Sequence, residues 1–178
     1  LYGAEQRRWL ERLELEHDNL RATLEWAFTP ASPEAAAGSG EEPPGQGLRR
    51  RVEMGLRAVA AIPRFWNGYG YLREGAGWLQ RGLALSEGCD LAVRADALGV
   101  LGWLVNMLGD TPRAKQLQLQ SLELFRACGD ERGMAEALDT LGDSTWFERA
   151  YDEARQYYGE GLALRRRLGE PGAIGLAL

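Results

Sequence analysis

The 178-residue sequence has very few of the side chains on which most active sites depend. It contains one histidine, two cysteines and a single lysine, Lys115, while every other basic residue is arginine. A metal site built on two histidines is therefore excluded, and no serine and aspartate stand at a spacing that favours a triad with His17. His17 falls inside an amphipathic pattern, so we interpret it as a hydrogen-bonded residue at a helix interface and not as a catalytic base. The sequence predicts no catalytic, cofactor-binding or metal-binding residue, and hence no enzyme.

Long hydrophobic runs and an excess of positive charge are also missing. The best apolar run, 100–108, is interrupted by glycine and asparagine and falls far short of the ~18 residues of a membrane span. The first 20 residues are charged and amphipathic, unlike a cleavable signal. The net charge of −5 argues against non-specific binding of nucleic acid. We therefore expect a cytoplasmic segment without membrane or direct nucleic-acid partners.

The two cysteines are expected to remain thiols. Cys89 and Cys128 occupy nearly equivalent places in neighbouring repeats of the pattern described below. Packed helices lie about 8–10 Å apart, whereas a disulfide needs Cα atoms within ~7 Å. Two thiols suit a reducing compartment.

What the sequence does contain is a period of 40 residues. The offset (141 − 101 = 40) relates Leu98 to Leu138, Leu101-Gly102 to Leu141-Gly142, Ala114 to Ala154, and Gly129 to Gly169. A weaker copy lies 39 residues upstream, where Leu83 corresponds to Leu122. Periods of about 20–50 residues are typical of stacked-repeat architectures, which are binding scaffolds more often than enzymes.

Both full copies fit part of the pattern W-x2-L-G-x2-Y, then A-x3-F, then P, of tetratricopeptide helical hairpins. They keep Leu-Gly and Ala and lack the Pro, and only the second has an aromatic residue, Tyr158, where the first has Gln118. Closely crossing helices leave little room for side chains, so we expect Gly102 and Gly142 at the crossing inside each hairpin. The predicted fold class is all-α: a tetratricopeptide-like right-handed superhelix of antiparallel helical hairpins with repeats of about 40 residues.

Periodicity and turn residues predict helix nearly everywhere within one structural domain overall. An N-terminal connecting segment, 1–28, holds one helix over 4–28, and a flexible linker rich in proline follows over 29–47. A helix over 48–67, kinked at Pro63, pairs with one over 71–86. Later helices are expected over 91–108, 112–128, 130–148 and 150–168, with Thr111 and Asp130 as N-caps. The repeats then occupy about 48–86, 91–128 and 130–168, and a further repeat starts over 170–178.

A partner-binding face is expected on the first helix of each hairpin, which lines the concave surface of such stacks. Aromatic groups beside asparagine and aspartate favour a peptide-binding groove with apolar anchors and polar orienting groups. The alternative is that the large side chains pack between repeats. The candidate residues are Trp103, Asn106, Met107, Asp139, Asp143, Trp146 and Phe147.

Outside the linker over 29–47, nearly the whole chain resembles a known family, most specifically in its N-terminal segment. The residues that carry this resemblance in the N-terminal segment are WLERL (9–13), EHDNLRA (16–22) and LEWA (24–27). They look like the segment that follows the ATPase and winged-helix modules in bacterial signal-transduction ATPases of the STAND/NB-ARC type, transcriptional regulators of the LuxR or AfsR/SARP kind with tetratricopeptide repeats. No phosphate-binding loop G-x-x-x-x-G-K-[ST] and no recognisable winged helix occur in these residues.

The resemblance implies a protein- or peptide-binding scaffold that serves as the sensor or regulatory arm of a multidomain ATPase. Its partner would be a protein or peptide, with the ATPase module of the same full-length protein as one candidate. The alternative is a structural oligomerisation module without its own ligand, whose partner is another copy of the chain. An enzyme would need a cluster of titratable groups in a pocket, and the residues for one are scarce.

Overall fold

The computed structural model describes residues 4–30 and 45–169, and every regular element within them is an α-helix. The chain divides into two compact units, Leu1–Cys89 and Asp90–Leu178, where the sequence predicted one structural domain. Most of the predicted linker over 29–47, and the whole of the further repeat over 170–178, lie outside the described residues. The described end of that linker is already helical, because the next helix begins at Gln46 and not at Leu48.

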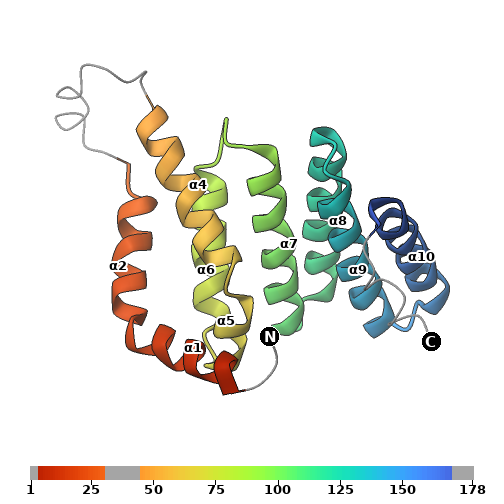
Figure 1. Cartoon of the computed structure of the whole chain (residues 1–178), viewed down its shortest axis with the longest axis horizontal. Helices are drawn as coiled ribbons and strands as arrows, with labels where there is room; N and C mark the ends of the chain where they lie inside the picture. The colour runs from red at the N-terminus through yellow and green to blue at the C-terminus, as the bar shows by residue number, and fades with distance from the viewer. Residues whose placement is uncertain (1–3, 31–44, 170–178) are drawn as a thin grey trace. The chain divides into compact units, whose positions relative to one another are not determined.

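The helices of the first unit differ from the sequence prediction at two breaks. Among the described residues they are, in chain order, α1 (Ala4–Leu15), α2 (His17–Ala27), α4 (Gln46–Ala60), α5 (Pro63–Gly68) and α6 (Leu72–Ala84) (Figure 1).

The single helix predicted over 4–28 is wrong at Glu16, where φ is −96° and ψ is 7°. The break turns α1 away from the direction of α2 (Figure 1), so that Leu10 and Leu13 reach the segment 61–65. The kink predicted at Pro63 is a complete break, with Ile62 at φ −124°. Pro63 begins α5 because the first helical position needs no N–H donor.

Two aromatic side chains organise the core of the first unit, and glycines make room for them. The ring of Phe28 lies against Gly55 of α4 and Gly82 of α6, where an added Cβ would stand 2.6 Å and 2.7 Å from the same ring carbon. Trp66 covers Gly75 in the same way and donates from Nε1 to the Val59 carbonyl oxygen at 3.1 Å. Helix backbones therefore approach the rings directly, and the indole N–H keeps a partner in the apolar interior.

Helix α2 is joined to α6 by a charged cluster at its edge. Arg21 donates from Nε and Nη2 to the two carboxylate oxygens of Glu74, each at 2.7 Å. These bonds hold the pKa of Glu74 below its ordinary value, although burial acts in the opposite direction. His17 is buried, with Nε2 3.2 Å from Oε1 of Glu74 and its ring against Phe65. Its position at a helix interface agrees with the interpretation from the sequence, but Nε2 makes no hydrogen bond there.

Up to residue 169, where its description ends, the second unit consists of two antiparallel hairpins, α7 (Leu91–Met107) with α8 (Thr111–Cys128) and α9 (Glu131–Phe147) with α10 (Tyr151–Leu168). The predicted boundaries agree to within one residue at each end, apart from the cap of α8. Asp110, not Thr111, is the N-cap, and its carboxylate accepts from the Arg113 amide. The prediction that Asp130 caps α9 is confirmed.

The repeated glycines lie at the crossings of the hairpins, as the sequence predicted. A Cβ on Gly102 would stand 2.8 Å from Cγ of Gln118 and 3.1 Å from the carbonyl oxygen of Ala114. On Gly142 it would stand 2.5 Å from the ring of Tyr158. In both copies the glycine thus faces the residue four positions after the repeated alanine: Gln118 after Ala114, and Tyr158 after Ala154.

At a second contact in each hairpin, the glycine and the larger side chain stand on opposite helices in the two copies. In the first hairpin Gly99 of α7 faces Ser121 of α8, with 3.2 Å from a Cβ built on the glycine to the serine Oγ. In the second hairpin the corresponding positions hold Asp139 of α9 and Gly161 of α10, with 2.9 Å from a Cβ on Gly161 to Asp139 Oδ1. Each crossing therefore accommodates one side chain, supplied by opposite helices in the two copies.

The two hairpins of this unit pack through an apolar core with one polar pair. The core comprises Ala95, Leu122, Phe125, Ala137, Leu138 and Leu141. Gln118 and Ser144 are both buried, and the Ser144 hydroxyl donates to Gln118 Oε1 at 2.9 Å. The residue by which the first copy departs from the aromatic pattern is therefore satisfied by the next hairpin.

The turn between α9 and α10 keeps the shape of its counterpart with less suitable residues. Gly109 has φ 93° between α7 and α8, and Arg149, 40 residues later, has φ 63°. A left-handed conformation costs an ordinary residue about 1–2 kcal/mol. Ala150 then stands at the N-cap of α10 and makes no side-chain cap, unlike Asp110. This turn is locally strained and uncapped.

Candidate functional site

The two aspartates of the candidate face on α9 are engaged within their own hairpin. Asp139 forms an ion pair with Arg165 of α10, and Asp143 accepts the hydroxyl hydrogen of Tyr158 at 2.6 Å. Both contacts cross the hairpin beside the glycine crossings described above. These carboxylates therefore hold α10 against α9. The sequence had suggested instead that they are presented to a partner.

Burial changes the acidity of this cluster. The pKa of Asp139 is raised by burial, and the hydrogen bond from Arg165 offsets only part of that effect. Burial also raises the pKa of Tyr158, and the hydrogen bond to Asp143 raises it further. A phenol of raised pKa remains protonated and keeps donating to Asp143 at neutral pH. The cluster has a structural role that this geometry explains without a ligand.

The aromatic residues of the candidate face remain exposed. Trp146 is 55% exposed and Phe147 is 69% exposed, so the core-packing alternative does not describe them. Tyr151, at the first position of α10, is 51% exposed, and its ring centroid lies 4.8 Å from that of Trp146 with an angle of 65° between the rings. Sequence reasoning missed Tyr151 because it lies on the second helix; its place directly after the turn that follows Trp146 was the available signal.

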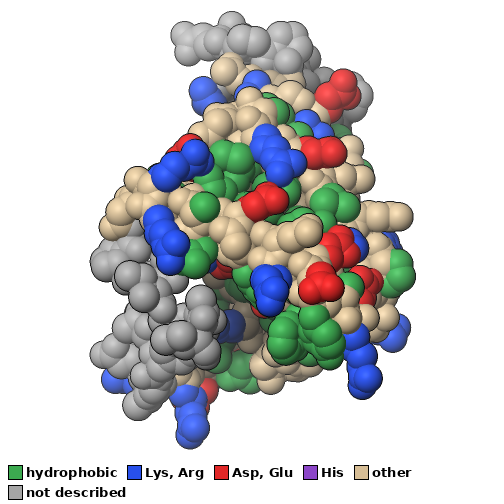
Figure 2. All heavy atoms as spheres, turned by 90° about the vertical axis from the view of Figure 1, so that its right-hand side faces the viewer, with side chains coloured by type: hydrophobic (Ala, Val, Ile, Leu, Met, Phe, Trp, Pro, Cys, Tyr) green, Lys and Arg blue, Asp and Glu red, His purple; other side chains and the backbone are tan. Residues whose placement is uncertain are grey.

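We name this region the α9–α10 turn surface and define it as Trp146, Phe147, Glu148, Tyr151 and Asp152. All five are exposed. On the face that Figure 2 shows, hydrophobic side chains lie beside Asp or Glu and Lys or Arg side chains. Large apolar groups surrounded by charged groups are typical of protein interaction sites.

The candidate residues of the first hairpin are less accessible. Trp103 and Asn106 are half-buried on α7, and Met107 is 40% exposed. Leu108 follows it with a similar exposure at the end of the helix. Met107 and Leu108 thus also lie next to the turn of their hairpin, at the repeat positions that correspond to Phe147 and Glu148, whereas Leu119, which is 37% exposed, lies within α8.

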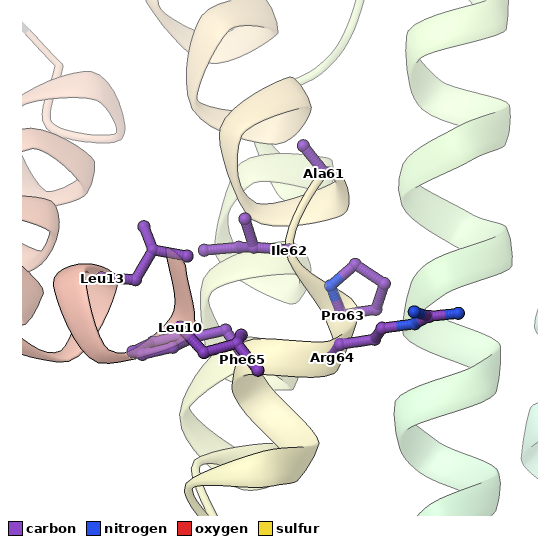
Figure 3. A pocket seen from close by; sticks show the side chains of 7 residues that line it. All are labelled: Leu10, Leu13, Ala61, Ile62, Pro63, Arg64 and Phe65. Atoms are coloured by element: carbon purple, nitrogen blue, oxygen red, sulfur yellow. The ribbon is translucent and has the colours of Figure 1, made fainter. Parts of the chain in front are cut away.

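A small recess in the first unit is a weaker candidate for a ligand site. Its volume is about 230 Å³, and Leu10 and Leu13 of α1 form one wall while residues 61–65 form the other (Figure 3). Arg64 extends away from the two leucines (Figure 3). Ligand sites usually measure about 300–1,000 Å³ and contain convergent polar groups, and this recess has neither property.

Within residues 4–30 and 45–169, no group of three or more potential metal ligands comes together. Neither Cys89 nor Cys128, which both belong to the described part, forms a disulfide, so the predicted thiols are confirmed. In the same part of the chain no helix is long and apolar enough to cross a membrane.

Comparisons with known proteins relate the chain to helical-repeat structures. No family model and no curated protein matches the sequence. Among solved structures, the crystal structure of BtubC (BKLC) from P. vanneervenii is similar with a TM-score of 0.66 and 17% identity, over 88% of this chain. The chain spans 58% of the length of BtubC. The crystal structure of MamA is similar with a TM-score of 0.52 and 16% identity, over 92% of this chain and 88% of MamA.

Identities this low establish the fold alone. Both similar structures are helical-repeat proteins, and MamA has a tetratricopeptide-like fold. The described helices, the glycine crossings and these two similarities together confirm that the chain is an all-α protein of the tetratricopeptide-like class.

Proposed function

We propose that this chain is a protein-binding repeat scaffold and the regulatory arm of a bacterial multidomain ATPase that controls transcription. The observation that carries the scaffold role is that Trp146, Phe147 and Tyr151 are exposed at one end of the α9–α10 hairpin. Large exposed aromatic side chains supply most of the binding free energy in many protein interfaces. The segments 9–13, 16–22 and 24–27 support the ATPase context through their resemblance to such regulators.

In this role the arm binds the ATPase module of its own full-length protein in one nucleotide state and releases it in the other. A ligand shifts a two-state equilibrium only through a difference in its affinity for the two states. The nucleotide-dependent difference in affinity is therefore the property that defines the proposed function.

The test is a calorimetric titration of the 178-residue chain with the purified ATPase module of the parent protein, loaded with ADP or with a non-hydrolysable ATP analogue. We expect dissociation constants that differ at least about fivefold, a coupling of about 1 kcal/mol. Binding to neither form contradicts the regulatory arm. Self-association of the purified chain without binding of the module would favour the oligomerisation module instead.

A further inference from the structure

The tryptophans of this chain show a recurring partnership with arginine. The guanidinium carbon of Arg51 lies 5.1 Å from the ring centroid of Trp26, which is 55% exposed. Arg12 lies over Trp9 at 5.7 Å, and Arg81 lies over Trp78 at the same distance. A cation placed over an indole face within about 6 Å is attracted by the ring quadrupole. In the first unit the chain itself supplies that cation.

Trp146 is as exposed as Trp26 but has a different neighbour. Trp146 contacts the ring of Tyr151, and because the two exposed rings meet at an angle of 65° their faces point in different directions. Two electron-rich faces that meet at an angle can contact one cationic group together. The α9–α10 turn surface therefore offers the aromatic rings of a cation–π pair, whereas in the first unit Trp26 already has Arg51 as its cation.

Carboxylates stand next to these aromatic residues in the sequence. Glu148 directly follows Phe147, and Asp152 directly follows Tyr151, and both are exposed. Nζ of Lys115 in α8, the one lysine of the chain, lies 2.9 Å from Glu153 Oε1 and 3.8 Å from Glu148 Oε2 and so pairs with the acidic side of the turn. Arg149, in the turn, and Arg155 are the other cations between 143 and 155, where Asp143, Glu148, Asp152 and Glu153 supply four carboxylates. Carboxylates thus outnumber cations even when Lys115 is included.

We propose that the α9–α10 turn surface binds an arginine-bearing apolar segment of a partner protein, with the guanidinium against Trp146 and Tyr151, its charge opposite Asp152 and Glu148, and the flanking apolar side chains on Phe147. This inference rests on the proposed scaffold function and names the chemistry of the partner. Arginine suits the site better than lysine because its planar, weakly hydrated guanidinium stacks on aromatic rings and pairs with carboxylates. An acidic or phosphorylated segment is disfavoured by the same carboxylates.

The probes are three capped tripeptides, acetyl-Leu-Arg-Leu-amide and its analogues with citrulline or glutamate in the middle. Citrulline has almost the shape of arginine without the charge. Each is titrated into the 178-residue chain while the indole N–H resonance of Trp146 is followed by NMR. We expect the arginine peptide to bind about fivefold more tightly than the citrulline peptide and the glutamate peptide to bind most weakly. Equal affinities of the arginine and citrulline peptides would overturn the inference.

Variants separate the site from general surface effects. Trp146→Leu and Asp152→Asn should each reduce the preference for arginine over citrulline by at least about twofold. Trp26→Leu is the matched control, because Trp26 is equally exposed and already has Arg51 on its ring, and it should leave the preference unchanged. Arg149→Gly should raise the affinity for the arginine peptide, since it removes a competing cation from the turn. An identical loss in the Trp26 and Trp146 variants refutes the assignment.

The same variants distinguish failure of this inference from failure of the proposed function. If the ATPase module binds with nucleotide-dependent affinity and Trp146→Leu does not weaken it, the scaffold function stands and this site is wrong. If the arginine peptide binds selectively but the module binds in neither nucleotide state, the site stands and the regulatory arm is wrong.

Discussion

Gly142→Ala should destabilise the chain, although alanine is the better helix former. The added methyl would stand 2.5 Å from a ring carbon of Tyr158, where ordinary contacts are 3.4–4 Å. The ring must therefore move by about 1 Å, which weakens its 2.6 Å hydrogen bond to Asp143. Overpacking typically costs about 1–3 kcal/mol, and helix propensity returns about 0.8–1.0 kcal/mol. With the weakened hydrogen bond included, we expect a net loss of about 1–2 kcal/mol.

Gly159→Ala in the same hairpin is the matched control. Gly159 lies within α10, and a Cβ added there would meet no atom within 4 Å. Only helix propensity acts at this exposed position, so the variant should be stabilised by about 0.5–1 kcal/mol. Urea denaturation followed by circular dichroism at 222 nm measures both changes, and unchanged slopes show that the unfolded states are comparable.

A double-mutant cycle identifies the cause of the loss. In the background of Tyr158→Leu the ring is absent, so Gly142→Ala should cost at least about 1 kcal/mol less than in the natural sequence. If Gly142→Ala stabilises the chain as much as Gly159→Ala does, or if Tyr158→Leu leaves its cost unchanged, the repeated glycine does not serve close packing and the explanation of the 40-residue pattern fails.

Three further predictions concern other contacts. Ser144→Ala should reduce the free energy of unfolding by about 1–3 kcal/mol, because it leaves the buried amide oxygen of Gln118 without its hydroxyl donor; Gln118→Leu in the same chain should recover part of that loss in urea denaturation. Arg21 lowers the pKa of Glu74, so the ionised carboxylate stabilises the fold above its unfolded pKa of ~4.3, and this contribution disappears as the pH falls through the lower folded pKa. Glu74→Gln should therefore flatten the decrease in unfolding free energy between about pH 5 and 3. An unchanged slope would contradict the assignment. Arg149→Gly should raise the thermal midpoint and add about 0.5–1 kcal/mol, because glycine accepts φ 63° without steric cost, whereas a lower midpoint would show that the arginine makes a compensating contact.

The sequence anticipated those features that depend on contacts repeated at one register. Gly102 and Gly142 were predicted at helix crossings because a glycine inside a helix requires a packing reason, and their contacts with Gln118 and Tyr158 supply it. Asp130 was recognised as a cap because capping is local. The period also placed every helix boundary of the second unit within one residue, the cap of α8 excepted.

The remaining errors come from contacts between segments that are distant in sequence. The amphipathic pattern continues through Glu16, yet the helix breaks there, and Leu10 and Leu13 meet residues 61–65. Sequence spacing placed Asp139 and Asp143 on a binding face and could not show that α10 supplies Arg165 and Tyr158 to them. Tyr151 was missed for a different reason: only the first helix of each hairpin was expected to carry the binding face, and the contact of Tyr151 with Trp146 crosses the turn from the second helix. The candidate site was therefore only partly predictable: its exposed aromatic residues on α9 were found, but their neighbours were not.

The exchanged crossing contacts set a rule for recombining these helices. Gly99 with Ser121, and Asp139 with Gly161, each combine one glycine and one larger side chain. A chimera that joined the sequence of α9 to that of α8 would bring Asp139 and Ser121 into a space sized for one side chain, and the reciprocal chimera would bring two glycines together and leave a void. Whole hairpins are therefore the interchangeable parts of this unit.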